Sequence, residues 1–251
     1  MTNPLKWANL GGLLLVLLLN TLANTLPING LTTGELSALY PNRFVPAGFT
    51  FSIWGVIYLA LVGFVAFQFR PAGNRLRDSI GQWFFLSCLA NASWILAWHY
   101  MQPILALLIM LFLLWSLVQI YLRVTALPFR ENWPGILPFQ LYLGWICIAT
   151  IANTTAVLTY AGWDGGGLAQ ATWAAIMAAA GTAIGLFFLV RYKDIAFGLV
   201  VLWALYGIYS GQAEGGLLQE TLQFAMGITG GGVAGILLRN LLPGKKIKKT
   251  S

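Results

Sequence analysis

Eight apolar runs, each about 20 residues long, are the feature of this chain that most restricts its fold. A run of that length crosses the hydrocarbon core of a bilayer as one α-helix, whereas strands of a membrane barrel are shorter and alternate in polarity. The sequence therefore predicts an all-α integral membrane protein with about eight transmembrane helices. The runs cover about residues 7–26, 49–69, 82–100, 103–122, 135–158, 168–190, 192–210 and 217–241.

The composition supports this class. Hydrophobic residues make up 59% of the 251 residues and charged residues only 8%, whereas a soluble domain carries about 25% charged residues. A soluble fold of this size could not bury so much apolar surface. Cys88 and Cys147 both lie inside apolar runs, so we expect two free, buried thiols and not a disulfide.

The basic residues predict the orientation of the chain in the membrane. If the N-terminus lies on the inner side, eight spans place every one of the 14 Lys and Arg residues except Arg43 on that side. Cytoplasmic loops of membrane proteins carry such an excess. We therefore expect both termini to be cytoplasmic, in a multi-pass protein of a bacterial plasma membrane.

The net charge of +7 is interpreted as this orientation signal and not as a nucleic-acid site. For the basic tail, residues 243–251, a topology anchor and a contact with anionic membrane lipids are both open.

Catalytic and metal-binding patterns are missing from the sequence. No acidic or basic residue lies near the middle of any run, and there is no GxSxG, HExxH, carboxylate pair or Cys/His cluster. We predict no catalytic residue, no metal site and no required cofactor. His99, the single histidine, lies near the outer end of the third run. It could be a hydrogen-bonded interfacial residue, an axial ligand of a tetrapyrrole metal, or a catalytic base.

Three runs carry aromatic and amide residues at helical spacing, so each set shares one face of a helix. Such faces could form a ligand pocket with flat apolar walls and a few hydrogen-bonding groups. They could equally be tight helix contacts bridged by asparagine. The residues are Phe51, Trp54 and Tyr58; Asn91, Trp94 and Trp98; and Trp145, Ala149 and Asn153.

The same three segments resemble the second, third and fifth spans of the TspO/MBR family, the tryptophan-rich sensory or translocator proteins. The segments are FTFSIWGVIYLALVGFVAFQ, FFLSCLANASWILAWHY and LPFQLYLGWICIATIANTT. The motifs occur in family order within residues 1–160, the length of the five-span family unit. Three further spans follow, which the five-span family lacks.

The resemblance implies three parts: a five-helix ligand-binding bundle over 1–160, three additional transmembrane helices over 161–242, and the tail. In the family, the loop before the second span covers a pocket inside the bundle. Phe44 and Pro46, with Phe49, would cap that pocket here. The remaining ligand-binding positions implied are Phe51, Trp54, Tyr58, Asn91, Trp94, Trp98, Trp145, Ala149 and Asn153.

The ligand that the resemblance implies is a hydrophobic, planar molecule such as a porphyrin, a haem-type molecule or another tetrapyrrole. Family members have been described as transporters, sensors or weak porphyrin-degrading enzymes. Two other functions stay open: a permease-like or regulatory subunit that acts through a protein partner, and a membrane enzyme for a tetrapyrrole, isoprenoid or lipid.

The last three spans carry glycines four residues apart, at Gly181 and Gly185 and at Gly227, Gly231 and Gly235. Small residues let helices approach closely. We therefore expect the sixth and eighth spans to pack against each other or against a partner in a homodimer.

Overall fold

The computed structural model describes residues 4–26, 28–212 and 215–241, and these residues contain helices and no β-strand. Eight long helices confirm the predicted all-α membrane fold. Their bounds are α1 Pro4–Thr25, α3 Ile53–Phe67, α5 Trp83–His99, α6 Pro103–Val124, α7 Phe129–Tyr160, α8 Gln170–Tyr192, α9 Ile195–Ser210 and α10 Leu217–Leu241. Short helices lie between them: η1 Ile28–Gly30, α2 Thr33–Ala38, η2 Gly48–Ser52, η3 Pro71–Gly73 and α4 Asn74–Ile80.

Six of the described helices are long and apolar enough to cross a membrane by themselves. A seventh span forms if Pro71–Ile80 and Trp83–His99, which are bent by 66° at their junction, are taken together. The remaining helix, α9, has 16 residues and is about 24 Å long. It is therefore shorter than the roughly 30 Å hydrocarbon core of a bilayer.

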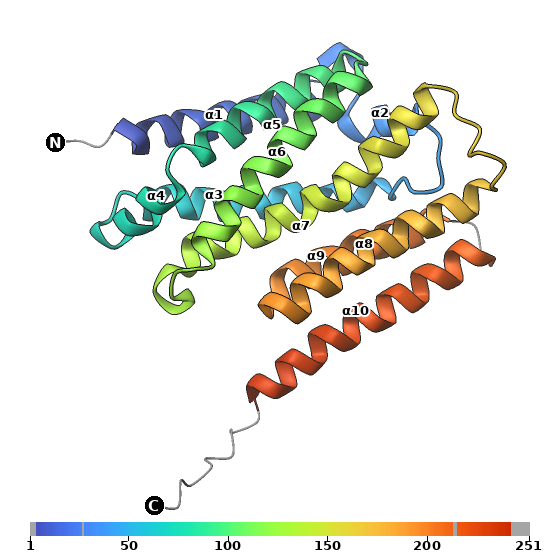
Figure 1. Ribbon diagram of the computed structural model, residues 1–251. Helices are drawn as coiled ribbons and strands as arrows, with labels where there is room; N and C mark the ends of the chain where they lie inside the picture. Colours follow the sequence, from blue (N-terminus) through green and yellow to red (C-terminus); the bar gives the residue numbers. More distant parts are fainter. Residues whose placement is uncertain (1–3, 27, 213–214, 242–251) are drawn as a thin grey trace, which may run out of the picture.

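The helices lie side by side, and α1 begins at the same end of the bundle at which α10 ends (Figure 1). The connections from α3 to α5 and from α6 to α7 lie at that end, whereas those from α1 to α3 and from α7 to α8 lie at the opposite end. We call the opposite end the outer end. Cytoplasmic placement of the other end stays a prediction, and tail residues 243–251 lie outside the described residues.

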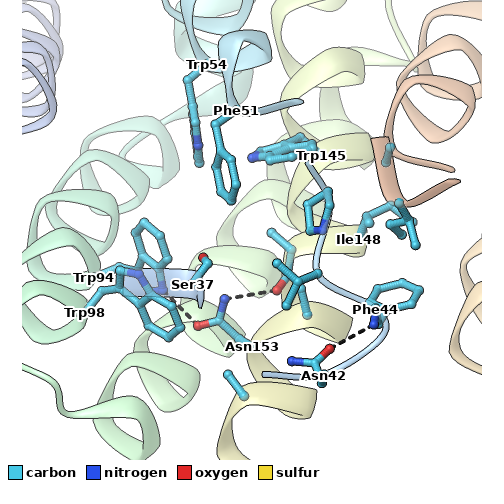
Figure 2. A pocket seen from close by; sticks show the side chains of 17 residues that line it. Ser37, Asn42, Phe44, Phe51, Trp54, Trp94, Trp98, Trp145, Ile148 and Asn153 are labelled. Carbon is cyan, nitrogen blue, oxygen red and sulfur yellow. Dashed lines mark hydrogen bonds between the residues drawn. The ribbon is translucent and has the colours of Figure 1, made fainter. Parts of the chain in front are cut away.

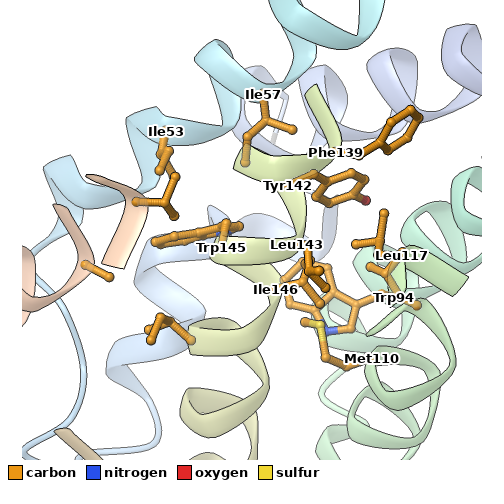
Figure 3. Close-up of a cluster of buried hydrophobic side chains, with 14 of the residues drawn as sticks. Ile53, Ile57, Trp94, Met110, Leu117, Phe139, Tyr142, Leu143, Trp145 and Ile146 are labelled. Carbon is orange, nitrogen blue, oxygen red and sulfur yellow. The ribbon is translucent and has the colours of Figure 1, made fainter. Parts of the chain in front are cut away.

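Helix α7 lies at the centre of the molecule. It packs against α3 and α6 on one side and against α8 and α9 on the other. Within the first part of the chain, α5 packs against α1 and α6. Helix α10 covers α8 and α9. Large buried side chains gather around α7, among them Tyr142 and Trp145 (Figure 3). The three C-terminal helices are therefore attached to the bundle mainly through α9 and α7.

Helix α7 starts earlier than the sequence indicates. The apolar run begins at Gly135, but the helix begins at Phe129 and contains both Pro134 and Pro138. Residues 129–134, which precede the predicted run, are therefore helical.

The glycine faces of the last three spans are used differently from the expectation. Helices α8 and α10 do pack together, as predicted. However, Gly181 faces Ile148 of α7, and Gly185 faces Val201 of α9. The three spaced glycines of α10 have open space where a Cβ would lie (Gly227, Gly231 and Gly235). The α8–α10 contact therefore does not depend on them.

Candidate functional site

An aromatic pocket lies toward the outer end of the bundle, between α3, α5, α7 and α9 (Figure 2). Residues 40–52, between α2 and α3, cover it, and we call this segment the lid loop. Nine of the eleven predicted positions line the pocket: Phe44, Pro46, Phe51, Trp54, Trp94, Trp98, Trp145, Ala149 and Asn153. The structure thus brings residues from three separate sequence motifs to one place.

The indole and phenyl rings of the wall contact one another in pairs. Trp94 and Trp98, one turn apart on α5, stack with their centroids 5.8 Å apart and their planes within 14°. Trp54 lies edge-on to Trp145 at 6.2 Å, and Phe51 lies edge-on to Trp145 at 6.1 Å. These edge-to-face and stacked contacts hold the rings in fixed orientations relative to one another.

Two of the indole N–H groups in this wall have no hydrogen-bond partner in the described part of the chain. Trp94 Nε1 donates to Asn153 Oδ1 at 3.1 Å, and the Asn153 amide donates to the carbonyl of Ala149 at 3.0 Å. By contrast, Trp98 Nε1 and Trp145 Nε1 are buried and find no acceptor among the described residues. A buried donor without a partner is rare and costs free energy, so an acceptor that reached either N–H group would be stabilised.

Tyr58 and Asn91 lie beside the pocket and do not line it. Asn91 is 1% exposed; its Oδ1 accepts from Asn20 Nδ2 at 2.9 Å, and its Nδ2 donates to the Tyr142 hydroxyl at 2.7 Å. It therefore bridges α1, α5 and α7. Tyr58 stacks on Trp54 with centroids 5.3 Å apart. Whether either residue contacts a ligand stays a prediction.

Several lining residues were missed by the sequence reasoning. Ile148, Ala152 and Ala156 follow Trp145 on the same face of α7, so continuing the helical spacing would have found them. Ala204 and Ile208 come from α9, outside residues 1–160. Nothing in the sequence indicates that α9 reaches this pocket. The other missed residues are Ser37, Asn42 and Val45.

Helix α9 also holds the lid loop in place. The backbone N–H of Ala47 donates to the carbonyl of Gly207 at 2.9 Å, and Trp203 Nε1 donates to the carbonyl of Thr50 at 2.9 Å. Just beyond the helix, Gln212 Nε2 donates to the carbonyl of Arg43 at 3.0 Å.

Phe49, which we expected to cap the pocket, packs against α9 instead. Phe49 lies against Trp203, with centroids 5.6 Å apart, and against Tyr206 at 5.9 Å. It is 45% exposed and does not line the pocket.

Tyr40, at the start of the lid loop, packs on Trp98 at 5.5 Å. Burial raises the pKa of the Tyr40 hydroxyl, so the group is neutral at physiological pH.

The pocket is closed in this structure. Its volume is about 50 Å³, enough for a few water molecules, whereas sites for drug-sized ligands have roughly 300–1,000 Å³. The lid loop and the aromatic rings would have to move before such a ligand could enter.

His99 is engaged in holding the segment between α1 and α3. Its Nδ1 lies 2.9 Å from the carbonyl of Ile28, and its Nε2 lies 3.2 Å from the Thr33 hydroxyl. A carbonyl can only accept, so Nδ1 carries a proton, and in the neutral ring with this tautomer Nε2 accepts from the Thr33 hydroxyl. With both ring nitrogens occupied and the side chain fully buried, His99 has the contacts of a structural residue. The described residues contain no group of His, Cys, Asp and Glu that could hold a metal ion.

The comparisons with known proteins agree with this architecture. A family model described as TSPO-like protein matches residues 6–238, a range that includes α8, α9 and most of α10. No curated protein and no solved structure matches the chain. Because the family match covers nearly the whole length, the resemblance seen in three short motifs holds for the chain as a whole. The chain belongs to the family of TSPO-like proteins.

Proposed function

We propose that this membrane protein binds a planar, hydrophobic ligand such as a porphyrin in the aromatic pocket. The observation that carries the proposal is a pair of buried indole N–H groups, of Trp98 and Trp145, for which the described residues offer no acceptor, in a pocket walled by aromatic rings. A tetrapyrrole offers both complements, because it is flat and apolar and carries hydrogen-bond acceptors. The membership in the TSPO-like family supports the same class of ligand.

The closed pocket, with a volume of about 50 Å³, is too small for a porphyrin and must open before one can bind. Binding requires the lid loop to leave α9, so the ligand stabilises an open state over the closed one. The described lining residues include no ionisable side chain. The proposal is therefore for binding, as part of transport or sensing, and not for acid–base catalysis.

The test replaces the indoles by a ring without an N–H. Detergent-purified protein is titrated with a porphyrin, following quenching of tryptophan fluorescence and the porphyrin absorbance, for wild type, Trp98→Phe, Trp145→Phe and the double variant. Trp115→Phe is the matched control, because Trp115 is 55% exposed on α6 and away from the pocket. We expect each pocket variant to lose about threefold to tenfold in affinity and the control to lose none. Equal affinities for all five proteins would overturn the proposal.

A second function, as a subunit acting through a protein partner, is favoured by one observation. Helix α10 presents the exposed glycines Gly227, Gly231 and Gly235 on a face with open space. A helix of another subunit could approach this face closely. Cross-linking in membranes, followed by identification of the bound chain, tests this function; a monomer with no bound protein would argue against it.

A further inference from the structure

A second cavity lies on the other side of the lid loop. Its volume is about 280 Å³, larger than the closed pocket and near the lower end for small-molecule sites. It shares Asn42 and Phe44 with the pocket, so Phe44, which is 1% exposed, separates the two spaces. We call it the outer cavity. Its other walls come from the end of α7, the α7–α8 connection and the start of α8.

The aromatic wall of the outer cavity is fixed by the connection between α7 and α8. Trp173 Nε1 donates to the carbonyl of Gly165 at 2.6 Å, and the rings of Trp163 and Trp173 meet edge-to-face with centroids 4.7 Å apart. Gly165 has a φ of +85°, and a Cβ there would lie 2.8 Å from the carbonyl oxygen of Leu168. Glycine therefore permits the turn that holds Trp173, and a pre-organised ring wall lowers the cost of binding.

A cationic group stands at the rim. Arg43 is exposed, and its guanidinium makes no salt bridge in the described part of the chain. Its backbone is held by Gln212, so its position on the lid loop is set. Asp164, the other charged lining residue, has a partner, because its Oδ1 accepts from the N–H of Gly166 at 2.8 Å. Arginine binds carboxylates with two parallel hydrogen bonds.

We propose that the outer cavity is a second binding site, for a planar apolar molecule that carries a carboxylate. The ring of the ligand lies against Trp163 and Trp173, and the carboxylate pairs with Arg43. Apolar contacts come from Leu158, Leu168 and Met177. Because Phe44 is the partition, a ligand here lies next to the pocket but does not need it to open. This site goes beyond the proposed function and depends on α8, which a five-helix bundle lacks.

The experiment separates the two sites by filling each in turn. Full-length, detergent-purified protein is titrated with a dicarboxylic porphyrin and with its dimethyl ester. Ala149→Leu fills the pocket, and Met177→Trp fills the outer cavity. Arg43→Gln removes the charge, with Arg239→Gln, at the other end of the bundle, as the control. Thermal melting shows which variants fold. If Met177→Trp does not fold, Arg43→Gln and the dimethyl ester still test the outer site.

We expect two binding events in the wild type, of which Ala149→Leu removes one. The remaining event should weaken about tenfold in Arg43→Gln or with the ester, and should disappear in Met177→Trp. Two results would overturn the outer site. In the first, the affinity of the event left in Ala149→Leu is the same for the acid and the ester, and is unchanged by Arg43→Gln and Met177→Trp. In the second, Ala149→Leu removes all binding. If the wild type shows a single binding event that is kept in Ala149→Leu and lost in Met177→Trp, the outer site is supported and the proposed binding in the pocket is overturned.

Discussion

The backbone N–H of Ala47 in the lid loop donates to the carbonyl oxygen of Gly207 in α9, 2.9 Å away. The two residues belong to opposite ends of the chain, one before the second long helix and one near the end of the seventh. Through this bond the C-terminal helices contact the cover of the pocket. We therefore expect access to the pocket to depend on α9, which lies outside residues 1–160.

Gly207 is required for this close approach, because a Cβ there would overlap the side chain of Thr50. We expect Gly207→Ala to push the lid loop off α9, lowering the free energy of unfolding by about 1–3 kcal/mol and speeding porphyrin association. Stopped-flow fluorescence and thermal melting measure the two effects. Gly211→Ala is the control, since its new Cβ would have only ordinary contacts at 3.5 Å with Ala47 and Val45. If Gly207→Ala loses the expected stability but binds porphyrin at the wild-type association rate, the contact between the lid loop and α9 does not limit access.

Asn91 should matter for stability before it matters for binding. Asn91→Ala removes the donor to the Tyr142 hydroxyl and one of the two bonds that the Asn20 amide donates, the other being to the carbonyl of Val16. We therefore expect a loss of about 1–2 kcal/mol in unfolding free energy. Tyr142→Phe, which removes one bond only, should cost less. Denaturation followed by tryptophan fluorescence checks both. If Asn91→Ala weakens porphyrin binding at full stability, the residue belongs to the ligand site after all.

His99 should not ligate haem. Both of its ring nitrogens are hydrogen-bonded, to Ile28 and Thr33, so a metal would have to displace one of these contacts. We expect the haem absorption spectrum of the protein to be the same in the wild type and in His99→Gln. Melting should detect a small loss of stability from the freed Ile28 carbonyl. A haem band that shifts only when His99 is replaced would contradict the structural role.

The glycines of α8 and α10 should respond differently to enlargement. Gly185→Leu meets Val201 at 3.0 Å, so we expect about 1–3 kcal/mol of destabilisation from overpacking. Gly231→Leu meets nothing within 4 Å, so the fold of the single chain should keep its stability. A change of oligomeric state in Gly231→Leu, measured by light scattering in detergent, would identify this face as an interface. Equal destabilisation in both variants would mean that α10 is packed differently.

The membrane class, the eight helices and the three aromatic faces could be predicted from the sequence, because they follow from local properties. The length of an apolar run sets a span, and helical spacing sets which side chains share a face. For this reason the helical spacing groups Trp94 with Trp98, and Trp145 with Ala149 and Asn153, and these residues do line one pocket. Ligand binding by them stays a prediction. The start of α7 at Phe129 was not predicted, because proline near the beginning of an apolar run is also typical of a turn.

The tertiary structure decided what those faces contact. Sequence spacing places Asn91 on the same helical face as Trp94 and Trp98. Only packing shows that the Asn91 amide is used between Asn20 and Tyr142, while the Trp98 N–H finds no acceptor within the described residues. Likewise, no local pattern relates Ala47 to Gly207. Hydrophobicity and helical period specify which residues are buried in the bundle; which buried groups find partners depends on how distant helices approach one another.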